Sequence, residues 1–289
     1  MHKDDKWSKK RRRKDNIFHG LLLITIGFSI LALLLLLYQV LSSGLSWLTW
    51  DFITSMPSRF PKKSGIFSAL VGSIWTIGLT TLFSIPLGVG TAIYLEEYAN
   101  KKSRFYRILQ LNISNLAGVP AIVYGLLGLA VFVRVLGFGR SILSGALTLT
   151  LLILPVIIVS SQEAIKSVPY SMKEGSHALG VTKWQTITGV VLPYSLPGIL
   201  TGSILAISRA MGEAAPLIIV GAAGYINFLP NGPMDSFTAL PIQIYNWTSR
   251  PQADFQHVAA AGIIVLIIIL LSANAIAIFL RNKYQNRID

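Results

Sequence analysis

The sequence predicts an all-α protein that crosses a membrane six times. Its residues are 53% hydrophobic and only 13% charged, whereas a soluble domain is about 25% charged. Six apolar stretches approach or exceed the length of about 20 residues that a helix needs to cross the hydrocarbon layer. The net charge of +13 collects at the ends of these stretches, which indicates contact with lipid headgroups rather than with nucleic acid.

Apolar and polar stretches divide the chain into two parts. Residues 1–65 comprise a basic tail that we expect to be flexible, a first span over 17–41 and an external loop. That apolar stretch is too long for a cleaved signal peptide, so we expect it to be retained. Residues 66–289 contain the other spans, for which the expected ranges are 66–95, 108–133, 141–161, 196–222 and 259–280. Pro120 predicts a kink in the third span.

The distribution of Lys and Arg predicts the orientation of the chain. Six spans put both termini on one side, where the termini and loops hold 18 Lys and Arg residues, against six on the other side. Basic residues accumulate on the cytoplasmic side of membrane proteins. We therefore expect a multi-pass protein of the cytoplasmic membrane whose termini and long loop over 162–195 are cytoplasmic.

Two charged residues, Arg209 and Glu213, lie inside the fifth predicted span. A charge at the centre of a membrane helix costs roughly 2.5–3.5 kcal/mol on insertion scales and usually marks a functional site. Their spacing allows the two side chains to pair on a continuous helix. Pro216 would also deprive the carbonyl of Gly212 of its helical partner.

A helical wheel of this span separates small residues from bulky ones. Arg209 and Glu213 share a face with small residues and proline, which are Gly198, Gly202, Ala206 and Pro216. The opposite face carries bulky residues that we expect to meet lipid, namely Leu200, Ile204, Ile207, Met211 and Ile218. Since small residues allow helices to approach closely, the charged face should point into a helix bundle or a pathway.

The planar guanidinium of Arg209 is suited to an oxyanion substrate, which it can bind through two parallel hydrogen bonds. The alternative is a static Arg209–Glu213 pair that fixes helix packing. Asn115 and Tyr124 are further candidates for lining a path, although they and Asn274 could instead hydrogen-bond neighbouring helices. The chain has no cysteine and no His-Glu-x-x-His motif, so we expect neither a catalytic site nor a metal site.

The cytoplasmic loop has the pattern of a short helix, a glycine turn and a second short helix. Glu174 is followed by Gly180 and then by Val190-x-Leu192-Pro193. This pattern resembles the Glu-Ala-Ala loop of ABC importer permeases, with Gly175 and Ser176 in place of two alanines. The resemblance implies that an ATPase subunit is contacted through Glu174, Gly175, Ser176, Gly180, Leu192 and Pro193. The alternative is an amphipathic loop that lies on the membrane surface.

Residues 66–280 as a whole resemble an ABC type-1 importer transmembrane domain. Three further segments resemble the permease subunits of phosphate-specific transport systems, and favour the PstA type over its PstC sibling. They are Arg209-Ala210-Met211-Gly212-Glu213-Ala214-Ala215-Pro216-Leu217, Val119-Pro120-x-x-Val123-Tyr124-Gly125 and Leu240-Pro241-x-Gln243-Ile244. The resemblance implies a PstC-type partner permease, a PstB-type ATPase dimer, an external phosphate-binding protein and inorganic phosphate as the substrate.

The chain itself lacks a glycine-rich loop followed by Lys-Ser or Lys-Thr, which is the loop that cradles nucleotide phosphates. We therefore expect no cofactor in this chain, with ATP and magnesium bound by the partner ATPase. The alternatives are a PstC-type sibling, a permease for another oxyanion, and a secondary transporter or channel that works without ATP.

Overall fold

The computed structural model describes residues 3–222 and 224–285, and its described elements are all helical. Five helices are long and apolar enough to cross a membrane. A bent pair, α4 and α5, raises the number to six if it is counted as one span. The prediction of an all-α polytopic protein is therefore confirmed.

The first half of the described chain contains three long helices and several short elements. They are α1 (Lys3–Gly44), η1 (Leu45–Trp47), α2 (Trp50–Thr54), η2 (Pro61–Lys63), α3 (Phe67–Ile93), η3 (Tyr94–Tyr98), α4 (Arg104–Leu116), α5 (Ala121–Gly128), η4 (Leu129–Val135) and α6 (Ile142–Lys166).

The second half begins with short elements and ends with a long helix. They are α7 (Tyr170–Ala178), α8 (Lys183–Thr186), η5 (Ile187–Val191), α9 (Leu192–Gly212), α10 (Ala215–Val220), α11 (Leu240–Thr248) and α12 (Asp254–Gln285). Because α8, η5 and α9 form one continuous span from Lys183 to Gly212, the loop between the fourth and fifth spans is shorter than the expected 162–195.

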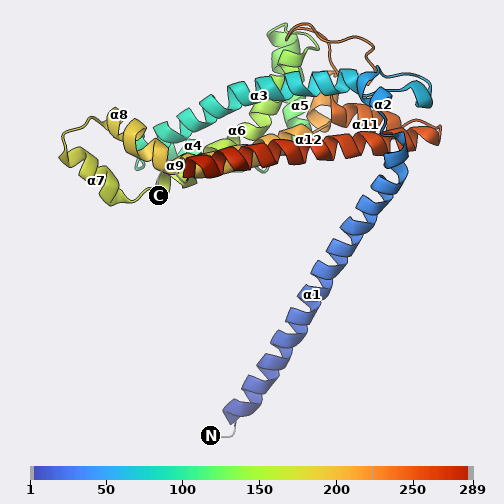
Figure 1. The fold of residues 1–289 in the computed structure, drawn as a ribbon. Coiled ribbons are helices and arrows are strands. Elements are labelled where there is room, and N and C mark those ends of the chain that lie inside the picture. The colour runs from blue at the N-terminus through green and yellow to red at the C-terminus, as the bar shows by residue number, and fades with distance from the viewer. Residues whose placement is uncertain (1–2, 223, 286–289) are drawn as a thin grey trace.

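Helix α1 diverges from the other helices along most of its length (Figure 1). It meets them at its C-terminal end, where a Cβ added at Gly44 would lie 2.7 Å from backbone atoms of Ala260 and Ala261 in α12. The basic segment that we expected to be a flexible tail is helical from Lys3 onward and continues into the first span. Its first two residues lie outside the described part of the chain.

Helix α6 lies at the centre of the bundle, and 67% of its most apolar 18-residue segment is buried. It packs mainly on α3 and α9, and glycines at both contacts bring the helices close together. A Cβ at Gly88 of α3 would lie 2.5 Å from Ile157, and one at Gly202 of α9 would lie 2.1 Å from the Ser160 hydroxyl. Small residues thus make α3, α6 and α9 a tightly packed unit.

Two of the expected spans are broken. The axes of α4 and the α5–η4 segment differ by 108°, so the kink predicted near Pro120 is present. The fifth span was expected to be continuous to residue 222, which is wrong because α9 ends at Gly212 and the backbone of Glu213 is extended. Pro216 instead lies in the first turn of α10, where its missing N–H breaks no helical hydrogen bond.

The close approach of α3 to the chain before α11 gives a test of this packing. A Cβ at Gly72 would lie 2.0 Å from the Thr238 carbonyl oxygen, which belongs to the backbone and has little freedom to move. We expect Gly72→Ala to destabilise the protein by about 1–3 kcal/mol, measured as a lower Tm in detergent. Gly78→Ala is the matched control, since a Cβ there meets nothing within 4 Å. Equal Tm values for the two variants would contradict this packing.

Candidate functional site

The candidate membrane site lies where α9 ends. The Arg209 Nε atom is 3.5 Å from the Glu213 Oε1 atom, so the predicted contact is present. It is not the helical pair that we expected, because Glu213 follows the last residue of α9 and has an extended backbone. The Arg209 side chain is 45% exposed and the Glu213 side chain is 24% exposed, which leaves room for a third group beside them.

Arg209 belongs to a face of α9 that the other described residues leave uncovered. Leu205, Arg209 and Gly212 recur at helical spacing and are exposed, whereas Gly202 and Ala206 are buried. Our expectation that Arg209 shares the packed face of these small residues is therefore wrong in detail. Arg209 lies in the uncovered sector, next to that packed face.

The bulky residues expected to face lipid are largely enclosed by protein. Leu200, Ile204, Ile207 and Met211 are half-buried, and only Ile218, in α10, is exposed. Ile207 packs against the main core cluster, and Met211 lines an apolar cavity with residues of α3 and α12. The reason is that α9 packs on α12 and α3 as well as on α6.

The two broken spans meet beside this site. A Cβ at Gly125 of α5 would lie 2.8 Å from the Pro216 Cα atom of α10. Tyr124 is buried, and its hydroxyl donates a 2.7 Å hydrogen bond to the Leu116 carbonyl across the α4–α5 bend. Tyr124 therefore lies next to the contact between α5 and α10, which at Pro216 is three residues along the chain from Glu213.

Asn115 and Asn274, two polar residues of the predicted spans, have different surroundings. Asn115 is exposed on α4, one residue before Leu116. Asn274 of α12 accepts a hydrogen bond from the Ser208 hydroxyl, so our interpretation that it bonds to a neighbouring helix is confirmed. This bond fixes α9 against α12 at the residue next to Arg209.

The loop between the fourth and fifth spans forms the predicted helix–turn–helix, which we call the knob (residues 170–186). Helix α7 ends in a turn at Gly180, whose φ of +74° is in the left-handed region that favours glycine. Helix α8 begins with a capping box in which Thr182 and Gln185 satisfy each other's backbone N–H groups. The Ser176 and Thr186 hydroxyls lie 3.0 Å apart and join the two helices.

The residues proposed to contact an ATPase divide into two groups. Glu174, Gly175 and Gly180 are exposed on the knob and are available to a partner. Ser176 is buried in the contact between α7 and α8. Leu192 and Pro193 form the first turn of α9, where Leu192 packs against a core cluster of α3, α6 and α9 residues. The second group therefore anchors the knob to the membrane helices.

Solved structures with a similar fold are transmembrane chains of ABC transporters. One is from a bacterial ABC transporter involved in the import of alginate, with a TM-score of 0.63, 18% identity and coverage of 94% of this chain and 98% of that chain. Another is from the inward-facing MetNI methionine ABC transporter, with a TM-score of 0.57, 18% identity and coverage of 76% and 97%. At this level of identity the likeness shows the fold, which is that of an ABC type-1 importer permease.

Relatives at higher identity cover nearly the whole chain. Phosphate transport system permease protein PstA 1 of Mycobacterium tuberculosis is 34% identical over 94% of this chain and 90% of its own length. The probable ABC transporter permease protein YqgI of Bacillus subtilis is 34% identical over 92% and 95%. PstA of Haemophilus influenzae is 30% identical over 96% of both chains.

The model of a protein family described as binding-protein-dependent transport system inner membrane component matches residues 84–289. This range includes the knob, both broken spans and the Arg209–Glu213 contact. The chain therefore belongs to the family of inner membrane components of binding-protein-dependent transport systems.

Proposed function

We propose that this chain is the PstA-type permease subunit of an ATP-driven importer that carries inorganic phosphate across the cytoplasmic membrane. The observation that carries the proposal is the Arg209 guanidinium, half exposed at a helix break inside a membrane span. The PstA names of several relatives support phosphate as the substrate. A PstC-type permease, a PstB-type ATPase dimer that binds ATP and magnesium, and an external phosphate-binding protein complete the complex.

The orientation and domain division belong to the same proposal. Both termini and the knob lie in the cytoplasm, where the ATPase dimer docks. Residues 1–65 form the N-terminal part, and residues 66–289 form the transmembrane domain. The excess of Lys and Arg at the termini and beside the knob supports this orientation.

The uncovered face of α9 supports a pathway between two permease subunits. An arginine exposed to hydrocarbon is unfavourable, and membrane arginines face protein or water instead. Leu205, Arg209 and Gly212 are exposed in this chain, so a second permease must cover the face or line a path with it. This requirement favours a heterodimer over a transporter that works alone.

Glu213 is suited to hold Arg209 when no anion is present. The contact is a single one of 3.5 Å, longer than the charge-assisted hydrogen bonds of about 2.7–2.9 Å that a strong pair forms. Phosphate can offer the guanidinium two parallel hydrogen bonds and so replace the carboxylate. A purely structural ion pair would be buried and bidentate. The loose geometry therefore favours an ion pair in which phosphate can replace the Glu213 carboxylate.

The first prediction concerns the guanidinium itself. Arg209→Gln should reduce phosphate uptake at least a hundredfold, because the variant lacks the positive charge that stabilises the anion inside the membrane. Uptake is measured in proteoliposomes with the partner subunits, and copurification checks assembly. Leu31→Ala, at an exposed position of α1 outside this face, is the control and should transport normally. Normal uptake by an assembled Arg209→Gln complex would rule out this role.

The second prediction separates an ATP-driven importer from a secondary transporter or channel. Phosphate uptake should stop when the catalytic glutamate of the partner ATPase is replaced by glutamine, because this chain has no nucleotide-binding loop of its own. Uptake by that complex, or by this chain without the ATPase, would support the alternative class.

The third prediction concerns the knob. A Cβ at Gly180 meets nothing within 4 Å, so a side chain there acts through backbone strain of roughly 1–2 kcal/mol rather than through a clash. Gly180→Val should distort the turn and lower ATPase stimulation by the loaded binding protein. Gly180→Asn should retain it, since asparagine tolerates a positive φ. Equal stimulation by both variants would show that the turn does not position the docking surface.

A further inference from the structure

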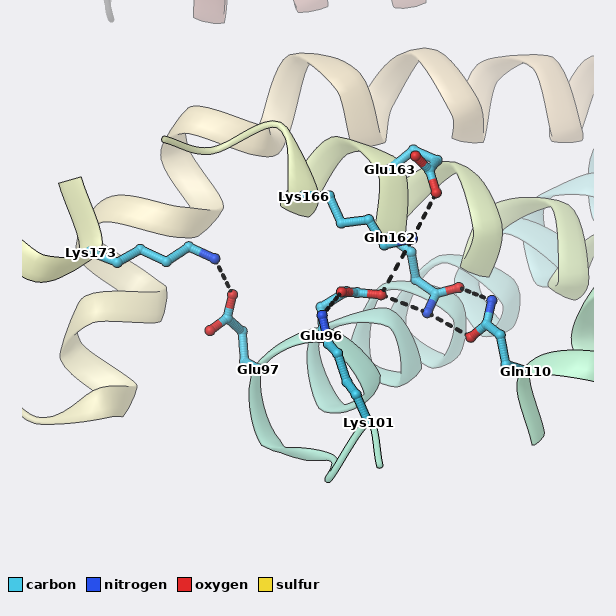
Figure 2. Close-up of polar contacts among 8 residues, drawn as sticks. All are labelled: Glu96, Glu97, Lys101, Gln110, Gln162, Glu163, Lys166 and Lys173. Atoms are coloured by element: carbon cyan, nitrogen blue, oxygen red, sulfur yellow. Dashed lines mark hydrogen bonds and ion pairs between the residues drawn. The ribbon is translucent and has the colours of Figure 1, made fainter. Parts of the chain in front are cut away.

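The cytoplasmic end of α3 carries two adjacent glutamates that point in different directions. The five residues Tyr94–Tyr98 form a π-helical turn, η3, and both glutamates belong to it. Figure 2 shows Glu96 directed toward Gln162 of α6 and Glu97 directed toward Lys173 of α7. Single turns of π-helix frequently occur at functional sites. In the sequence, both glutamates fall between the expected second and third spans, and no local pattern marks them as a site.

Glu96 is the centre of a buried polar cluster. Its side chain is only 2% exposed, and its carboxylate is 2.6 Å from the Lys101 Nζ atom and 3.8 Å from the Lys166 Nζ atom. The Gln162 side chain donates a 2.9 Å hydrogen bond to the same carboxylate. A buried carboxylate with this many partners resists displacement, because moving it would leave charges and amides unpaired.

Gln162 extends the cluster to a third helix. Its side-chain amide exchanges two hydrogen bonds with that of Gln110 in α4, with lengths of 3.1 and 3.0 Å. The cluster therefore ties the middle of α4 to the cytoplasmic ends of α3 and α6 (Figure 2). We call this set of helix segments the base.

Glu97 joins the base to the knob. Its carboxylate is 2.6 Å from the Lys173 Nζ atom, and both side chains are largely shielded from solvent, with exposures of 12% and 19%. A second contact lies nearby, since the Lys183 Nζ atom is 4.8 Å from the centre of the Tyr98 ring, within range of a cation–π interaction. Both helices of the knob are thus held by side chains of the same five-residue turn.

The ion pair matters because α7 has few other supports. Its main packing partners are α8 and η5, which belong to the knob and to the helix leading into α9. The backbone carries a movement of the knob directly into α9 through the continuous α8–η5–α9 helix. The Glu97–Lys173 contact offers a separate route, into α3 and through Glu96 into α4 and α6.

We propose that Glu97 and Lys173 are positioning residues that clamp the coupling helix α7 to the base, so that the ATPase moves α3, α4 and α6 together with α9. The inference rests on the proposed ABC permease function. It assigns the η3 turn as the part of the membrane bundle that follows the knob throughout the transport cycle.

The test compares single substitutions with an exchanged pair. Glu97→Gln and Lys173→Gln should each lower the phosphate transported per ATP hydrolysed about fivefold or more, the lower end of typical coupling between sites. The double variant Glu97→Lys with Lys173→Glu restores the ion pair and should regain most of the ratio. Glu163→Gln is the control, because Glu163 is exposed and pairs with Lys166 within α6.

Each outcome of these transport measurements either supports or overturns the clamp. Wild-type ratios in both single variants, or an exchanged pair that transports no better than they do, would overturn the clamp. If the single variants fail to assemble, the exchanged pair still decides, since it should assemble and transport.

A second measurement keeps the clamp separate from the proposed function. The chain has no cysteine, so Tyr98→Cys with Lys183→Cys gives this chain a single pair of thiols for a short bis-maleimide cross-linker in a complex whose partner subunits lack cysteine. This pair lies across the second contact between η3 and the knob, and it leaves Glu97 and Lys173 in place. Cross-linking should be equally efficient without nucleotide and in an ATP-trapped state. Loss of cross-linking in the trapped state would overturn the clamp even if phosphate is transported. Efficient cross-linking in a complex that carries no phosphate would refute the substrate and leave the clamp standing.

Discussion

The structure depends on one constraint, which is that a membrane interior accepts neither a bare charge nor a free backbone group next to lipid. Arg209 places a charge inside a membrane span, and within four residues the end of α9 leaves backbone groups without helical partners. They are tolerable only beside protein or water. The packing of α10 on α5, at Gly125 and Pro216, supplies part of that protein. The uncovered sector of α9 shows where the remainder must come from another subunit or from a water-filled path.

Rigid and adjustable regions of the bundle lie next to each other. Glycines at the α3–α6 and α6–α9 contacts bring backbones so close that the helices cannot slide without steric conflict. The breaks at Pro120 and Glu213 lie at the edge of this packed unit, where the chain leaves one helix and enters the next. In the proposed function, the loose Arg209–Glu213 contact at such a break would open when an anion competes for the guanidinium, while the core stays intact.

Local signals in the sequence predict the features that depend on neighbours along the chain. Apolar stretches predict the spans, Pro120 predicts the bend, and Gly180 with its flanking polar residues predicts the knob. The break after Gly212 could not be predicted, because Pro216 is compatible both with a kinked helix and with the first turn of a new one. A helical wheel orders residues by angle but does not show which neighbours cover them, so Met211 was assigned to lipid. The Glu96–Gln162–Gln110 cluster depends on three helices meeting in space, which periodicity does not reveal.

The two connections from the knob to the membrane have different consequences for Arg209. If the knob moved only α9, the tight glycine contacts with α6 would oppose the motion, since Gly202 lies directly against Ser160. If η3 moves α3, α4 and α6 along with the knob, that resistance disappears because the packed unit travels as one body. The relative motion is then concentrated where the packed unit meets α5 and α10, at the two breaks. The break at Glu213 lies about one turn from Arg209, so a movement that begins at the knob would be expressed at the charge inside the membrane.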